Sequence, residues 1–242
     1  MNGRVRAVMR KELREYRRNK LVVGTMAVLP IVFFVLPLVT VVALKQDATY
    51  ATIKGAVGSA TLSLFILPLI LPTIVAGYAV VGERDQGTLE PVLTTPVRRE
   101  ELLLGKALAA CVPTIAVAYV LYAIFILMVR LAGPPEAVRL MSASAELLAL
   151  GLAAPLLATF SIWVGLAISV RSTDVRAAQQ LSALAMLPMV GLLTLFTFRI
   201  ISPTVTVAIT GAVLVGVLDL AAWRVVSRMF DPERVLTRYG RA

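Results

Sequence analysis

The chain has 242 residues, of which 59% are hydrophobic and only 16% are charged, and this composition is typical of a membrane protein. It contains no histidine and one cysteine, Cys111. These counts exclude a Ser-His catalytic site, a histidine zinc site and a disulfide within the chain. We expect no metal site, and Cys111, inside an apolar run, is interpreted as a small packing residue.

The first 20 residues combine many arginines with apolar side chains at helical spacing. The apolar positions are Val5, Val8, Met9, Leu13 and Tyr16. This pattern predicts an amphipathic helix over residues 1–20 that lies on the inner membrane surface. A basic segment that only fixes the orientation of the first span is a compatible alternative.

Six uncharged runs of 19 to 28 residues follow, each long enough for a membrane-spanning helix. They predict an all-α, polytopic membrane protein that forms a single transmembrane permease domain over residues 1–242. The predicted spans are residues 21–44, 55–82, 107–129, 147–170, 177–198 and 200–223.

The distribution of lysine and arginine predicts the orientation. With the N-terminus inside, 19 of the 24 basic residues fall in inner segments and five in outer segments. We therefore expect a multi-pass protein of the cell membrane with both termini in the cytoplasm. The net charge of +10 then reflects orientation and attraction to lipid headgroups, and nucleic acid is not an expected partner.

Several polar or helix-bending residues lie inside the predicted spans. Pro68 and Pro72 are four residues apart in the second span and so share a face, while Gln179 and Gln180 open the fifth span. These four residues are candidates for lining a transport pathway, and static bending or packing is the alternative. Asp219, the only acid inside a predicted span, is expected to reach the inner interface.

The connection between the second and third spans, residues 83–106, carries five acids and four bases, unlike the strongly basic ends of the chain. Gly87 followed by Thr88 predicts a helix break and a new N-cap. Leu89, Val92 and Leu93 then form one apolar stripe. Thr95 and Pro96 predict a second helix start before Glu100 and Glu101. This predicts a short helix with an apolar face and a charged rim, suited to contact with another protein.

The string E-R-x-x-G-T-L-E-x-x-L-x-T-P-V-x-R-x-E-x-x-x-G-K, residues 83–106, resembles the signature of the type 2 permeases of ATP-binding-cassette (ABC) exporters. In that family the segment is a coupling helix that docks on the nucleotide-binding subunit. The inner turn R-S-T-D-V-R-A-A-Q-Q-L-S and the tail F-x-x-E-R-x-L-x-R are similar to further family motifs. The short connection around Arg199 departs from the family, where many members carry a longer re-entrant segment. The ATPase-docking residues implied by the resemblance are Glu83, Arg84, Gly87, Thr88, Leu89, Glu90, Val92, Leu93 and Pro96.

The chain has no Walker A motif, since its single Gly-Lys pair, Gly105-Lys106, is followed by Ala107. We therefore expect no catalytic residue and no cofactor on this chain, with ATP and Mg²⁺ bound by a partner ATPase. The resemblance implies an efflux permease that pairs with a second copy or a homologue. Two alternatives remain open at this stage: an ion-coupled secondary transporter, and a non-transporting membrane scaffold for a cytoplasmic ATPase.

Overall fold

The computed structural model describes residues 3–45, 48–82 and 98–229, and each regular element within these ranges is a helix. In chain order the helices are α1 (Gly3–Arg18), α2 (Lys20–Val42), α3 (Tyr50–Ala79), α6 (Arg99–Ala132), α7 (Pro135–Met141), α8 (Ser144–Arg171), α9 (Val175–Ala185), α10 (Leu187–Thr197) and α11 (Val205–Met229).

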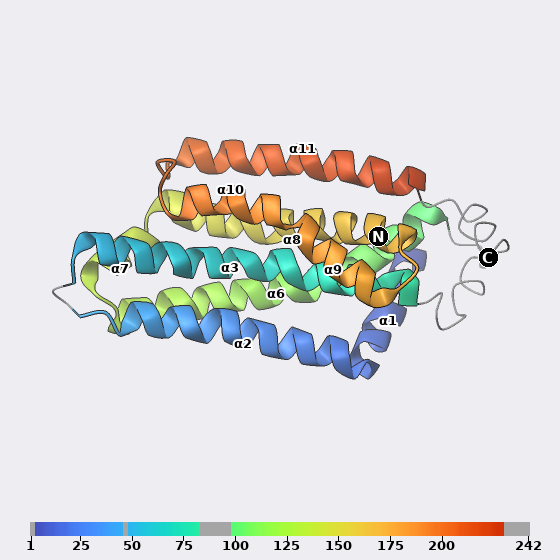
Figure 1. Cartoon of the computed structure of the whole chain (residues 1–242), viewed down its shortest axis with the longest axis horizontal. Helices are drawn as coiled ribbons and strands as arrows, with labels where there is room; N and C mark the ends of the chain where they lie inside the picture. Colours follow the sequence, from blue (N-terminus) through green and yellow to red (C-terminus); the bar gives the residue numbers. More distant parts are fainter. Residues whose placement is uncertain (1–2, 46–47, 83–97, 230–242) are drawn as a thin grey trace.

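The long helices run side by side with α3 in the middle of the bundle (Figure 1). Helix α3 packs against α2, α6, α8, α9 and α10, whereas α11 lies on the outside and packs mainly on α8. Helix α1 marks one end of the bundle, called here the α1 end, where α3, α8 and α11 finish and where α2, α6 and α9 begin. Helix α7 lies at the opposite end, called the α7 end.

Five helical segments are long and apolar enough to cross a membrane, which confirms an all-helical, multi-pass architecture. They are Tyr50–Ala76, Glu100–Ala132, Ser144–Arg171, Val175–Thr197 and Val205–Met229. The first predicted span, residues 21–44, corresponds to α2, where the apolar helix within the described residues is shorter, Met26–Val42. A sixth span therefore stays a prediction.

The fifth predicted span, residues 177–198, is not one continuous helix. Helix α9 ends at Ala185 and α10 begins at Leu187, with Met186 between them. Pro188 is the cause, because it has no N–H to donate and its ring clashes with the carbonyl four residues earlier. Proline is tolerated only in the first turn of α10, so the chain starts a new helix there.

Two of the prolines inside the other helices are accommodated by tyrosine hydroxyl groups of a neighbouring helix. Each proline frees the carbonyl four residues before it. Pro68 frees the carbonyl of Leu64, which accepts a hydrogen bond of 2.9 Å from the Tyr122 hydroxyl of α6. Pro155 of α8 frees the carbonyl of Gly151, which accepts one of 2.7 Å from the Tyr119 hydroxyl. These bonds satisfy two backbone carbonyls that would have no hydrogen-bond donor if they faced lipid chains.

The apolar side chains divide into two buried clusters and a large exposed surface. One cluster extends toward the α7 end around Phe65 and Phe125, and the other lies toward the α1 end around Leu103 and Leu166. Large apolar residues of α2 and α11 remain exposed, among them Leu36, Val213 and Leu220. An exposed apolar surface of this kind suits contact with lipid or with another membrane helix.

Candidate functional site

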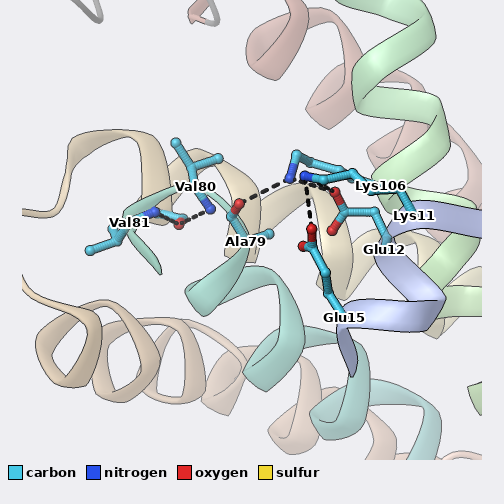
Figure 2. A network of polar contacts seen from close by, with 8 residues as sticks. Lys11, Glu12, Glu15, Ala79, Val80, Val81 and Lys106 are labelled. Carbon is cyan, nitrogen blue, oxygen red and sulfur yellow. Dashed lines mark hydrogen bonds and ion pairs between the residues drawn. The ribbon is translucent and has the colours of Figure 1, made fainter. Parts of the chain in front are cut away.

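A buried ion pair joins three helices at the α1 end. The Lys106 ammonium of α6 lies 2.9 Å from the Glu12 carboxylate of α1 and donates at 3.1 Å to the backbone carbonyl of Ala79, at the end of α3. Both side chains are almost fully buried, at 1% and 3% exposure. Figure 2 shows Lys106 between these two acceptors, with Lys11 and Glu15 of α1 beside them. Partly exposed Lys11 adds contacts of 3.6 Å to Glu12 and 3.2 Å to Glu15.

Polar contacts also fix the two chain segments that border residues 83–97. After α3 ends, the backbone N–H groups of Val80 and Val81 both donate to the Ser169 hydroxyl of α8 at 3.2 Å. At the start of α6, the Glu101 carboxylate accepts a hydrogen bond of 3.0 Å from the Arg98 N–H. The first turn of α6 carries Glu100 and Glu101, as predicted. The Ser169 bonds hold the chain that leads into residues 83–97 on the bundle, and the Glu101 bond caps the helix that follows them.

Helix α1 can approach α6 closely because residue 105 is glycine. A Cβ atom at Gly105 would lie 2.5 Å from the Val8 Cγ1 atom and 2.6 Å from its Cβ atom, too close for any side chain. The adjacent residue, Lys106, then reaches Glu12 across the same contact. The Gly-Lys pair therefore serves the packing of α1, with one residue allowing contact and the next forming the ion pair.

The five apolar residues predicted for the membrane-surface helix face the bundle in this structure. Val5 and Tyr16 are buried, while Val8, Met9 and Leu13 are partly buried against the cluster at the α1 end. The helix is present as predicted, from Gly3 to Arg18. Its apolar stripe contacts protein, and its position on a membrane surface stays a prediction.

A second buried polar cluster lies at the α7 end. The Glu146 carboxylate in the first turn of α8 accepts a hydrogen bond of 3.0 Å from the Thr61 hydroxyl of α3 and lies 3.5 Å from the Arg199 guanidinium. Arg199 also donates to the carbonyl of Leu140 at 3.3 Å. It follows α10 in a left-handed conformation, with φ of 56°. Arg199, noted in the sequence only for its short connection, therefore ties the α10 to α11 turn to α7 and α8.

Asp219 packs between two helices in the structure, and its predicted position at the inner membrane interface stays a prediction. Its carboxylate lies between α11 and α8 and accepts a hydrogen bond of 2.7 Å from the Thr159 hydroxyl. The second carboxylate oxygen, Oδ1, is buried without a hydrogen-bond partner in the structure. Thr159 is near the middle of α8, so this hydrogen bond links α11 to the central part of that helix.

A model of the ABC-2 family transporter protein matches residues 6–220. The chain belongs to the ABC-2 transporter family. The match covers α1 through most of α11, including the segment between α3 and α6. No curated protein matches the chain. The protein is thus an ABC-2 permease, the membrane component of a transporter family that works with an ATP-binding subunit.

The docking residues predicted for this ABC-2 permease lie outside the described residues. They are Glu83, Arg84, Gly87, Thr88, Leu89, Glu90, Val92, Leu93 and Pro96. Thr95, the predicted start of the following helix, also lies outside them, and the described part of α6 begins at Arg99. The structure therefore gives the anchoring of this segment and leaves its docking role a prediction.

The four pathway candidates are not equally accessible. Pro68 and Pro72 are buried within the bundle. Gln179 is half-buried and donates at 3.5 Å to the carbonyl of Ile74, whereas Gln180 is exposed. The adjacent glutamines therefore face different directions, and any pathway role of the four residues stays a prediction.

Glu12 is the site residue that sequence reasoning missed. It lies at helical spacing from Val5, Val8 and Tyr16, on the apolar stripe of α1. An acid on an apolar stripe is costly to bury unless a base meets it. The presence of an acid on the apolar stripe therefore indicated that Glu12 meets a base. The sequence could not identify that base as Lys106, which is 94 residues away.

Proposed function

We propose that this permease belongs to an ABC exporter and that residues 83–106 dock a separate ATP-binding subunit. The observation that carries the proposal is the anchoring of this segment at both ends. Lys106 joins α6 to α1 and to the end of α3, and Ser169 holds the chain just after α3. A displacement of the segment on binding another protein would therefore be transmitted to α1, α3, α6 and α8, because these contacts join all four helices.

In this proposal α2 is the sixth span and both termini are cytoplasmic. The α1 end then faces the ATP-binding subunit, which binds ATP and Mg²⁺. Two permease chains, identical or homologous, pair around the route. ATP binding and hydrolysis shift the pair between inward-open and outward-open arrangements through the docked segment.

An apolar anchor with a charged rim predicts a specific pattern of mutational effects. Leu89 and Val92 would each bury apolar surface worth roughly 1.5–3 kcal/mol, whereas an exposed ion pair at the rim contributes about 0–1 kcal/mol. Replacing the two apolar residues should therefore weaken docking far more than neutralising Glu90.

The test is copurification of the ATP-binding subunit with the permease carrying Leu89→Ala and Val92→Ala together. The matched control is Glu90→Gln, which alters the same segment without removing apolar area. We expect loss of the subunit from the double variant and retention in the control, with unchanged unfolding of the permease alone. Full retention in the double variant would make the segment a connector only.

Asp219 supports one second candidate, an ion-coupled transporter. A carboxylate between two spanning helices with an unpartnered buried oxygen is the kind of group that such transporters use. An ATP-binding subunit unable to hydrolyse ATP distinguishes the candidates, because it stops transport by an ABC exporter and leaves gradient-driven transport intact. The same experiment tests a scaffold, which would transport in neither case.

A further inference from the structure

A groove at the α1 end lies between α8, α9 and α11. Its volume is about 520 Å³. Its walls are mainly apolar, with Ala177, Leu181 and Val225 among the lining residues. Its polar lining consists of Arg171, Ser172 and Thr173, where α8 ends and the chain turns into α9. The groove is therefore apolar along the helices and polar at their ends.

The charge around this groove is strongly positive. Arg171, Arg176, Arg224 and Arg228 are all exposed, and none of them forms an ion pair with a carboxylate in the part of the chain that the structure describes. The neighbouring acid, Asp174, is already engaged, since its carboxylate accepts hydrogen bonds from the N–H groups of Arg176 and Ala177 at the start of α9. An anion in the groove would therefore meet the Arg171 guanidinium, and no carboxylate pairs with this arginine or the three others in the part of the chain that the structure describes.

We propose that this groove binds an anionic phospholipid of the cytoplasmic leaflet. The phosphate would lie at the Arg171 guanidinium and the Thr173 hydroxyl, since the Ser172 hydroxyl already donates to the Ile168 carbonyl at 2.9 Å. An acyl chain would lie along Leu181 and Val225. Guanidinium groups bind phosphate oxygens in a fixed, bidentate geometry, and cytoplasmic leaflets carry anionic lipids. The basic and hydroxyl groups at the helix ends match a phospholipid headgroup, and the apolar walls match its acyl chains. An acidic protein segment would bind the basic end but would leave the apolar walls uncovered.

The two tryptophans of the chain provide a direct reporter beside the groove. Trp163 and Trp223 form an edge-to-face pair with ring centroids 4.8 Å apart, across the contact between α8 and α11. Trp163 is one helical turn before Ala167, which lines the groove, and Trp223 packs directly on Trp163. A quencher on a bound acyl chain would therefore lie close to both indoles.

The test measures tryptophan quenching of the purified full-length chain in vesicles that contain brominated lipid. Brominated phosphatidylglycerol is compared with brominated phosphatidylcholine at matched mole fractions in an unbrominated phosphatidylcholine background. We expect phosphatidylglycerol to quench at the lower mole fraction. Arg171→Gln should weaken this preference about fivefold, as expected for removal of one basic residue at an anionic surface. Arg171→Lys should retain most of it.

The matched control is Arg10→Gln, which removes an exposed arginine of α1 at the same end of the bundle. It should leave the preference unchanged. Equal quenching by the two lipids in the unmodified chain would overturn the proposal, and so would an equal loss of preference in Arg10→Gln, which would indicate diffuse surface charge. Absence of quenching by both lipids would also overturn it, because the groove would then be covered by protein, such as a second copy.

Discussion

Removing the Lys106 side chain should destabilise the bundle far more than removing another lysine of the same network. Lys106→Met keeps much of the side-chain volume but leaves the Glu12 carboxylate, itself 3% exposed, with Lys11 at 3.6 Å as its remaining ion-pair partner among the described residues. Breaking a buried ion pair by removing one partner costs about 3–5 kcal/mol. The matched control, Lys11→Met, removes a lysine that is 37% exposed and should cost about 0–1 kcal/mol.

The assay is the free energy of unfolding in mixed detergent micelles, measured for Lys106→Met, Glu12→Gln and the double variant. The double variant should be less destabilised than the two single changes added together, because neither change then strands a buried charge. A coupling energy near zero, or equal effects of Lys106→Met and Lys11→Met, would refute the assignment of Lys106 as the buried link between α1, α3 and α6.

Three further predictions follow from the packing and the orientation. A cysteine at residue 48 should react with an impermeant thiol reagent from outside intact cells and one at residue 92 only after permeabilisation; labelling of residue 92 from outside would overturn the orientation. Thr159→Val should lower the free energy of unfolding by about 1–3 kcal/mol, because Asp219 loses its hydrogen-bond donor. Thr210→Val should be near neutral, because the Thr210 hydroxyl bonds to a carbonyl of its own exposed helical turn. Equal effects of the two changes would contradict the hydrogen bond between Thr159 and Asp219. Gly105→Ala should lower the free energy of unfolding by about 1–3 kcal/mol, because the added methyl group clashes with α1. Gly151→Ala should not destabilise the bundle, because a Cβ atom there meets open space. Unfolding in the same micelles measures both effects.

The helices were the part of the fold most accessible from sequence. Uncharged runs above the length of a membrane span predicted them because lipid leaves the backbone no alternative to helix. Their breaks were harder to predict, since Pro188 ends a helix near Met186 while Pro68 and Pro72 lie inside a continuous α3. The difference depends on neighbours, because a nearby hydroxyl such as that of Tyr122 can satisfy the carbonyl that a proline frees.

The polar links were the part least accessible from sequence. Glu12 and Lys106, or Glu146 and Arg199, are far apart along the chain and meet only because particular helices pack together. The charge pattern placed Lys106 in a loop motif, and only the packing of α1 on Gly105 shows why it is buried. The contact between Asp219 and Thr159 was missed for the same reason, since Thr159 belongs to another helix.

The most direct test of the central claim is photocross-linking from residue 92 in intact cells of the native host. A photoreactive side chain at position 92 should capture a protein that carries a Walker A sequence, G-x-x-x-x-G-K-[ST], identified by mass spectrometry of the cross-linked band. The same group at position 48, which is predicted to face outside, should not capture it. Failure to capture an ATP-binding protein from position 92, or equal capture from both positions, would contradict the docking of an ATPase on residues 83–106.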